Sequence, residues 1–298
     1  MERSTVVVVT WRGRDHVRQC LDALAAQHRP HSTLVVDNAS TDGTAEILAD
    51  HPSKPRVLRV SRNLGYAGAL AKALPNIRTP FVAWCNDDAA PAPDWLAELE
   101  DALDADPGAG AAGAVLTTSA GVRLTDDGHG ADVPTAEASV FGFCGGAALL
   151  RTDALRSIGG VPAGFFCYYE DTDTSWRLRL AGWRVLIVAG AKAGHLHGAS
   201  SEPGSFRFHR WNERNRLLML LRCAPVAVAW TQLARFAALT AVLPFRRSVG
   251  ARNFTVGLRL LVLAEVVVRL PAVWLARWRI GRRSSVRRSV VWRTWAGR

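Results

Sequence analysis

The chain has 298 residues, 49% of them hydrophobic, which excludes extensive disorder and allows one large domain or one domain with an appendage. Five scattered cysteines, with no Cys-x-x-Cys pair, exclude a disulfide framework and a zinc site and fit a reducing cytosol. The net charge of +11 divides unevenly, because residues 203–298 hold 19 of the 37 basic residues but only two acids. The first residues lead straight into a β-branched run, so we expect no signal peptide.

The first part of the chain alternates β-branched runs with amphipathic stretches. Thr5–Thr10 predicts a parallel strand buried on both faces, and Thr33–Val36 and Val57–Val60 predict two more strands. Asp15–Gln27 has a helical period, and a second helix is expected to begin at Ala45. This order predicts an α/β fold with a mostly parallel sheet. The sequence contains neither the Gly-x-Gly-x-x-Gly fingerprint nor the P-loop pattern.

Polar and glycine-rich loops follow these strands. Asp37–Thr44 is rich in Asn, Ser, Asp and Gly, and Asn63–Gly68 brings two glycines to a helix expected over 69–74. Glycines allow the backbone to approach a ligand closely, although a plain strand-to-helix turn uses the same residues. In open α/β sheets, ligands bind beyond the carboxyl ends of the strands, so both loops are candidates for a nucleotide site.

Two adjacent carboxylates follow the next apolar run. Phe81–Trp84 predicts a buried strand whose carboxyl end carries Asp87 and Asp88. Such a pair suits Mg²⁺ or Mn²⁺, which take oxygen ligands and share them with substrate phosphates. A solvated turn is the simpler alternative for this pair alone. A helix over 94–103 follows, and we expect Asp94 to cap it.

The middle of the chain is rich in glycine. A turn-rich connection over 104–113 is expected to lead into a strand over 114–118. The polar residues 121–138 predict a loop that lies over a site or forms a surface excursion. Val140–Leu150 is apolar and contains Gly145-Gly146, which predicts a core strand where the backbone meets a ligand.

Three acids, Glu170, Asp171 and Asp173, follow an aromatic run and precede a helix expected over 174–181. Acids at a helix start are favoured by the helix dipole and by capping, which gives a purely structural explanation. Two of the three suffice for capping, and the neighbouring aromatic residues suggest a pocket. We therefore favour a carboxylate that removes a proton from a hydroxyl group.

Two histidines stand in a Gly-Ser loop after a strand expected over 185–188. A lone histidine is more often a core or surface residue than a ligand. The pair His195 and His197 favours function, because neutral imidazole binds metals such as Mn²⁺.

Together these motifs resemble the family-2 glycosyltransferases of the GT-A fold, especially the rhamnosyl- and galactofuranosyltransferase-like branch. Each motif is weak alone, whereas the ordered set over about residues 4–222 is specific. The motifs are Thr10-Trp11, Asp37–Thr44, Asn63–Ala67, Asn86-Asp87-Asp88, Gly145–Ala147, Tyr169–Asp173 with Arg177, Gly182-Trp183, and His195-x-x-Gly198-x-Ser200. The resemblance implies a Rossmann-like GT-A domain over residues 1–222, with a mostly parallel central sheet flanked by helices.

The resemblance also implies roles for single residues. The donor would be a nucleotide-diphospho-sugar of the dTDP-rhamnose or UDP-sugar type, and the acceptor a hydroxyl of a cell-envelope or lipid-linked glycan. The implied donor-binding residues are Thr10, Asp37, Asn63, Asp87 and Gly146. Asp88 and His195 would hold Mg²⁺ or Mn²⁺, while Asp171 would be the general base, supported by Glu170 and Asp173. Transfer would invert the anomeric configuration in a single displacement.

The sequence departs from the family at two of these positions. Many relatives carry Asp where this chain has Asn86, and relatives often carry Asn where it has Lys72. The metal contact at Asn86 and the donor pocket at Lys72 are therefore not carried over from the family.

Residues 223–298 predict a basic α-helical appendage. Phe206–Leu221 predicts a helix, and Ala224–Phe245 and Phe254–Trp278 are long apolar stretches interrupted by arginines. A bilayer-spanning helix wants about 20 nearly uncharged residues, so we expect amphipathic helices at the inner face of the cell membrane, with tryptophans in the headgroup layer. A packed or dimerising helical unit is the alternative. Nucleic-acid binding ranks last, because the arginines alternate with long aliphatic runs.

Two other functions remain open from the residues. One is a non-catalytic scaffold that binds a sugar nucleotide, which the presence of Asp88, Asp171 and His195 disfavours. The other is a nucleotidyltransferase, which usually carries a glycine-rich basic loop after the first strand. Trp11–Arg14 matches such a loop only weakly. The prediction is thus a metal-dependent inverting glycosyltransferase.

Overall fold

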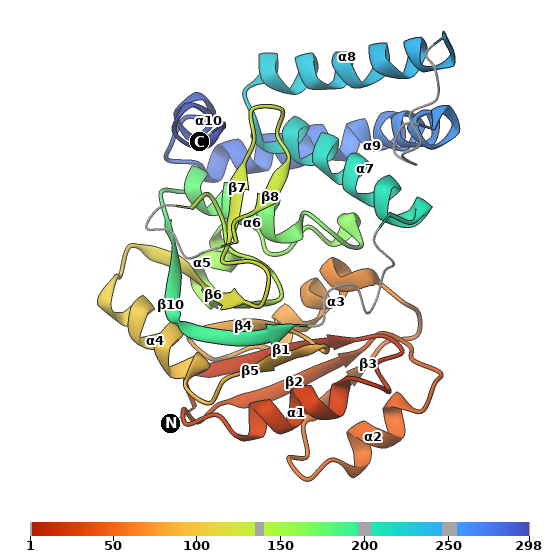
Figure 1. The fold of residues 1–298 in the computed structure, drawn as a ribbon. Coiled ribbons are helices and arrows are strands. Elements are labelled where there is room, and N and C mark those ends of the chain that lie inside the picture. Colours follow the sequence, from red (N-terminus) through yellow and green to blue (C-terminus); the bar gives the residue numbers. More distant parts are fainter. Residues whose placement is uncertain (1, 135–139, 196–203, 246–254, 298) are drawn as a thin grey trace.

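The computed structural model describes residues 2–134, 140–195, 204–245 and 255–297. This part of the chain forms an eight-stranded sheet in the order β3-β2-β1-β4-β9-β6-β10-β5 and a two-stranded hairpin of β7 and β8 (Figure 1). The strands are β1 (Ser4–Thr10), β2 (Ser32–Asp37), β3 (Arg56–Arg59), β4 (Phe81–Asn86), β5 (Ala89–Pro91), β6 (Ala109–Leu116), β7 (Val122–Leu124), β8 (Gly130–Asp132), β9 (Ala147–Arg151) and β10 (Arg184–His195).

Ten α-helices lie within the same described residues. They are α1 (Val17–Ala25), α2 (Thr44–Asp50), α3 (Gly65–Ala73), α4 (Trp95–Ala105), α5 (Thr152–Ser157), α6 (Glu170–Leu180), α7 (Phe206–Cys223), α8 (Val226–Val242), α9 (Val256–Arg283) and α10 (Arg288–Trp295). Short 3₁₀ turns cover Leu74–Asn76, Ala163–Phe165 and Leu243–Phe245.

The sheet is mostly parallel, as expected. β1 pairs in parallel with β2 and β4, β2 with β3, and β6 with β10, while β9 and β5 run antiparallel to their neighbours. β1 is buried along its whole length, which its β-branched sequence predicts. The α/β GT-A architecture with additional C-terminal helices is thereby confirmed.

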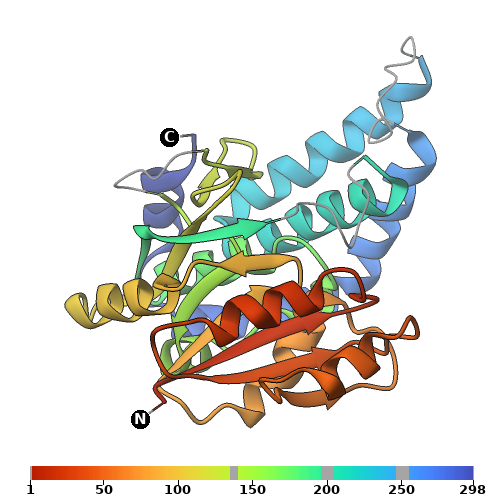
Figure 2. The ribbon, with the colours of Figure 1, turned by 60° about the horizontal axis from the view of Figure 1, so that its bottom comes forward.

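Helices cover both faces of the sheet, and the alternation along β1 shows which core each face joins. Val6 and Val8 pack in a core with residues of α1 and α4, whereas Val7 and Val9 pack in a second core with α3, α5 and α6. The second core continues through α7 into α9 and α10. Figures 1 and 2 show α7 beside α9, with α8 lying outermost. The C-terminal helices therefore share a core with the sheet.

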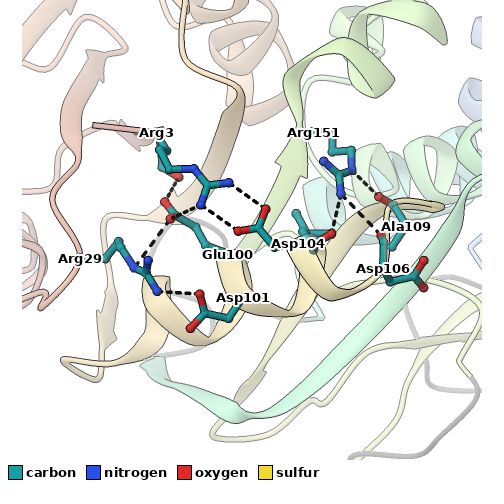
Figure 3. A network of polar contacts seen from close by, with 10 residues as sticks. Arg3, Arg29, Glu100, Asp101, Asp104, Asp106, Ala109 and Arg151 are labelled. Carbon is teal, nitrogen blue, oxygen red and sulfur yellow. Dashed lines mark hydrogen bonds and ion pairs between the residues drawn. The ribbon is translucent and has the colours of Figure 1, made fainter. Parts of the chain in front are cut away.

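Ion pairs tie α4 to the amino edge of the sheet (Figure 3). Arg3, just before β1, lies 2.7 Å from Asp104, and Arg29 lies 2.6 Å from Asp101. Glu100 is fully buried between the two arginines and accepts a hydrogen bond from Ser4. These contacts stabilise the edge opposite to the carboxyl ends of the parallel strands.

Several predicted boundaries are wrong. β6 begins at Ala109, within the expected turn, because its small residues let Leu178 and Trp183 pack closely over Gly110. The strand expected over 140–150 forms only from Ala147, since Gly142 instead bridges to Val122 of the hairpin. That hairpin occupies part of the loop expected over 121–138, of which 135–138 lie outside the described residues.

Two helix predictions are also corrected. The side chain of Asp94 does not cap α4, because its carboxylate lies 2.7 Å from Nδ1 of His28 instead. α6 begins at Glu170 rather than at Thr174, so the acids form its first turn.

Candidate active site

The candidate site lies at the carboxyl edge of the sheet. Thr10, Asp37 and Asn86 end the neighbouring strands β1, β2 and β4, with Thr10 opposite Asp37 in the register. His195 ends β10, and Gly146 precedes the antiparallel strand β9, so both reach the same edge. The topology thus gathers residues from five distant segments where α/β sheets bind ligands.

Asp37 and Asn63 lie in adjacent loops that Asn38 joins. The buried Asp37 accepts a hydrogen bond from the backbone N–H of Ser40 at 2.9 Å, and its Oδ2 lies 3.4 Å from Nε of Arg59. Asn63 accepts from the N–H of Gly65 at 2.7 Å. Asn38 accepts from Leu64 and donates to Gly65, which fixes the second loop against the end of β2.

Thr10 and Asp87 meet over Gly13. A Cβ atom at Gly13 would lie 2.1 Å from Oγ1 of Thr10 and 2.5 Å from Oδ2 of Asp87, so no side chain fits there. The pKa of Asp87 is raised to about 6, mainly by burial and to a smaller extent by the charge of Asp88, while a hydrogen bond with Thr10 opposes the rise. The loop after β1 can pass this close to Thr10 and Asp87 because residue 13 is a glycine.

Asp88 and His195 form a pair that can hold a metal ion. Oδ1 of Asp88 lies 3.1 Å from Nε2 of His195, and both side chains are 6% exposed. The amide of Asn86 lies 2.8 Å from the same nitrogen. Oxygen and imidazole ligands suit Mn²⁺ or Mg²⁺ when substrate phosphates complete the coordination, so the residues present fit such an ion.

Within the described ranges, no three or more side chains of His, Cys, Asp or Glu cluster as a metal site. The pair of Asp88 and His195 therefore needs ligands from a substrate or from water. His197, Gly198 and Ser200 lie outside the described residues, so the second histidine of the loop has no structural description.

Gly145 and Gly146 connect this pair to Asp171. The carbonyl of Gly146 accepts from the N–H of Asn86 at 3.0 Å, and a Cβ there would lie 3.4 Å from Nε2 of His195. The N–H of Gly145 donates to Oδ2 of Asp171 at 2.9 Å, and the carbonyl of Gly145 accepts from the hydroxyl of Tyr66 at 2.7 Å. Gly145 and Gly146 thus lie between the pair of Asp88 and His195 on one side and the candidate base, Asp171, on the other.

Glu170 and Asp171 stand in the first turn of α6, Glu170 buried and Asp171 half-buried. Burial raises the pKa of Asp171, while hydrogen bonds from the N–H groups of Gly145 and Thr172 oppose the rise. Burial and then the charge of Asp171 raise the pKa of Glu170 well above its ordinary value. Among the described residues, Oε2 of Glu170 has no hydrogen-bond partner. Both carboxyls therefore have the environment expected of proton-handling groups.

The structure does not bring Asp173 to this pair. Its side chain is fully buried, 2.6 Å from Nε of Arg177 and 3.4 Å from Nη2 of Arg222. That geometry favours a structural ion pair over the supporting role expected for Asp173.

Sequence reasoning missed several groups that shape the site. Arg59 and Asn38 support Asp37, Tyr66 supports Gly145, and Asn86 contacts His195. Tyr66 and Asn38 lie inside motifs already recognised, so their positions carried a usable signal. Arg59 ends a strand without any local motif.

Comparisons with known proteins show the family to which the chain belongs. The family model described as "Glycosyl transferase family 2" matches residues 5–159, about half of the chain. An N-acetylglucosaminyl-diphospho-decaprenol L-rhamnosyltransferase from Mycobacterium tuberculosis is 27% identical over 241 residues, which cover 67% of this chain and 78% of that protein.

Solved structures share the fold. The mannosyltransferase PcManGT from Pyrobaculum calidifontis, in complex with GDP-Man and Mn²⁺, has a TM-score of 0.57 at 22% identity, covering 93% of this chain and 84% of its own. GalNAc-T7 with UDP, GalNAc and Mn²⁺ has a TM-score of 0.66 at 12% identity, covering 91% of this chain and 58% of its own.

Proposed function

Because the chain belongs to glycosyl transferase family 2 and is a nucleotide-sugar glycosyltransferase, we propose that it transfers its sugar with inversion to a hydroxyl of a lipid-linked or cell-envelope glycan. The donor class we propose is dTDP-rhamnose or a UDP-sugar. The relative from M. tuberculosis carries the name of a rhamnosyltransferase acting on a diphospho-decaprenol glycan. That name supports rhamnose as the sugar and a lipid-linked glycan as the acceptor.

One observation carries the proposal. Asp88 with His195, and Asp171, come from segments far apart in the chain. Gly145 donates to Asp171, and a Cβ atom on the adjacent Gly146 would lie 3.4 Å from Nε2 of His195, which pairs with Asp88. A site for a donor diphosphate and a base for an acceptor hydroxyl must lie side by side for transfer to occur. Glycines at the junction let the backbone pass close to Asp171 and His195, because a Cβ atom at either position would lie within about 3.4 Å of those side chains.

The proposed roles follow from the chemistry of each group. Thr10, Asp37, Asn63 and Asp87 surround the nucleotide, and Gly146 allows the diphosphate to approach. Asp171 accepts the proton of the acceptor hydroxyl as its oxygen attacks the anomeric carbon, while the nucleoside diphosphate leaves from the opposite face. A single carboxylate base suits this displacement, since no covalent sugar intermediate is needed.

A divalent cation, Mn²⁺ or Mg²⁺, would be held by Asp88 and His195. When bound, the cation neutralises charge that develops on the leaving diphosphate. PcManGT and GalNAc-T7 were both solved with Mn²⁺, which supports the choice of ion.

We further propose that the protein works at the inner face of the cell membrane, where a lipid-linked acceptor is found. Large exposed apolar side chains gather on α8 and α9, among them Trp230, Trp274 and Trp278. Within the described residues, one helical segment, Val226–Phe245, is apolar and long enough to cross a bilayer, and 22% of its most apolar window is buried in the protein. We favour helices that lie on the surface, because arginines border these apolar faces.

A donor panel tests the proposal. The protein is incubated with dTDP-rhamnose, UDP-sugars or GDP-mannose and a polyprenyl-diphospho-N-acetylglucosamine acceptor, and release of nucleoside diphosphate is measured with and without Mn²⁺ or Mg²⁺. We expect acceptor-dependent release with one donor, abolished by chelation and by Asp88→Ala. Donor binding without release from any donor would instead indicate a scaffold.

A further inference from the structure

The loop that precedes Asp171 has a strained backbone. Phe166, Tyr168 and Tyr169 have φ values of 69°, 71° and 69°, which non-glycine residues rarely adopt. Phe166 is also the centre of a tight turn in which the N–H of Cys167 donates to the carbonyl of Phe165 at 2.9 Å. Such a backbone persists only where its surroundings hold it. Tyr169 is the N-cap residue of α6, and Asp171 lies in the first turn of that helix. This loop therefore sets the position of Asp171.

One side chain of α7 holds most of this loop. The amide nitrogen of Asn215 lies 3.0 Å from the carbonyl oxygen of Phe165, 2.8 Å from that of Cys167 and 2.8 Å from that of Tyr168. Asn215 is fully buried. The remaining carbonyl, that of Phe166, accepts from the N–H of Ala67 at 3.0 Å. All four carbonyls of 165–168 thus have a donor within hydrogen-bond distance. The two hydrogens of the Asn215 NH₂ group serve two carbonyls at a time, and the carbonyl of Phe165 also accepts from Nη2 of Arg214 and from the N–H of Cys167.

Arg214 orients this amide. Its Nε lies 2.9 Å from Oδ1 of Asn215, and because a guanidinium only donates, the amide oxygen must face it and the NH₂ group must face the loop. Nη2 of Arg214 donates to the carbonyl of Phe165 at 2.6 Å. Nη1 lies 3.3 Å from Glu265 of α9, one of two acids in residues 203–298. Figure 1 shows that α7 and α9 lie side by side.

We propose that Asn215, oriented by Arg214, is a positioning residue for the transfer reaction. It holds the strained loop so that the carboxylate of Asp171 stays against Gly145 and faces the acceptor. This inference rests on the proposed role of Asp171 as the base. It gives residues 206–223 a part in catalysis that is separate from membrane contact.

Two substitutions test the role of Asn215. Asn215→Ala removes the NH₂ group that donates to these carbonyls, and the isosteric Asn215→Asp keeps the shape but places a carboxylate against three carbonyl oxygens. We expect kcat for transfer to fall by about 10- to 100-fold in Asn215→Ala, and further in Asn215→Asp, because small misplacements of a catalytic group cost rate. The KM for the donor, and the affinity for UDP or dTDP alone, should stay within about twofold, since among the described residues the hydrogen bonds of Asn215 reach only the loop before α6 and Arg214.

The matched control is Asn212→Ala, one turn earlier on α7. Within the part of the chain that the structure describes, the amide of Asn212 bonds to the carbonyl of Phe208 in the same helix and to no other group. We expect kcat of this variant to stay within about twofold of the wild type. Should Asn215→Ala fail to fold, Glu265→Gln tests the same chain of contacts from α9, with an expected fall in kcat of about threefold.

The outcomes separate this inference from the function on which it rests. A kcat in Asn215→Ala equal to that of Asn212→Ala, with Asp171→Asn inactive, overturns the positioning role alone. A parallel loss of donor affinity and kcat in Asn215→Ala also overturns it, since it indicates general unfolding. An active Asp171→Asn overturns the base assignment and this inference together.

Discussion

At the scale of single residues, the site combines buried charge with close backbone approach. Glu170 and Asp171 lie side by side with raised pKa values, and glycines at 13, 145 and 146 remove the side chains that would separate the elements. Burying an acid without a partner costs stability, so such an arrangement is retained where it serves a reaction.

Glu170→Gln should stabilise the protein at high pH. A carboxyl whose pKa is raised on folding contributes stability that is present below its ordinary pKa and lost as the pH rises through the folded-state value. The amide lacks this loss, so we expect its melting temperature to exceed that of the wild type by about 3 °C or more near pH 8. The difference should shrink towards pH 4, as measured by thermal unfolding across pH. Glu46→Gln, an exposed residue of α2, is the control, and a difference that grows on acidification would contradict this account.

Gly13→Ala should weaken donor binding without unfolding the protein. The new methyl group would displace Thr10 and Asp87, which line the proposed nucleotide site from β1 and β4. We expect the Kd for UDP or dTDP, measured by calorimetry, to rise by about tenfold or more, equivalent to roughly 1.4 kcal/mol. Gly257→Ala in α9, where the added methyl meets open space, is the matched control. Unchanged affinity in Gly13→Ala would remove Thr10 and Asp87 from the donor site.

At the scale of elements, α9 has two faces of opposite character. Its exposed large apolar residues recur at intervals of seven as the pairs Leu260 and Leu261, Val267 and Val268, and Trp274 and Leu275. Such spacing places them on one side of the helix. Leu258, Val262, Val266 and Val273 face the core on the other side. With the basic charge of residues 203–298, this stripe suits an anionic lipid surface.

Val268→Glu should therefore weaken membrane binding. Val268 is 77% exposed, so the substitution leaves the core intact while placing a negative charge on the stripe. We expect co-sedimentation with phosphatidylglycerol vesicles to fall by about tenfold, because both the apolar and the electrostatic contributions are lost. Val57→Glu on β3, 47% exposed and far from α9 in sequence, is the control. Equal binding by the two variants would indicate that α9 faces another partner.

The sequence predicts the elements whose residues favour one structure locally. The β-branched run of β1 and the apolar run of β4 follow from composition, and the acids at their ends follow from the topology that such strands adopt. The start of β6 does not, because Ala109–Gly113 becomes a strand only through packing against residues of α6 and β10. Likewise, no sequence pattern around Asn215 indicates its contacts with the loop before α6. The three carbonyls near its amide belong to residues about 50 positions earlier in the chain.

At the scale of the whole molecule, one core joins the sheet to the basic C-terminal helices. It runs from Val7 and Trp84 through Trp176 of α6 and Leu217 of α7 to Val262 of α9. The ring of Trp176 also stacks on Trp292 of α10 at a centroid distance of 5.9 Å. The helices proposed to meet the membrane therefore share a core with α6, whose first turn carries Asp171. This arrangement would place a lipid-linked acceptor and the proposed base at the same edge of the molecule.

The most direct test of the central claim is the rate of sugar transfer by Asp171→Asn beside the wild type, with the donor and metal found in the panel. The substitution preserves the shape of the side chain and removes the proton acceptor. The account predicts that transfer falls by about 10²- to 10⁴-fold while the Kd for the nucleoside diphosphate and the melting temperature stay at wild-type values. Transfer by Asp171→Asn within about tenfold of the wild type would contradict it.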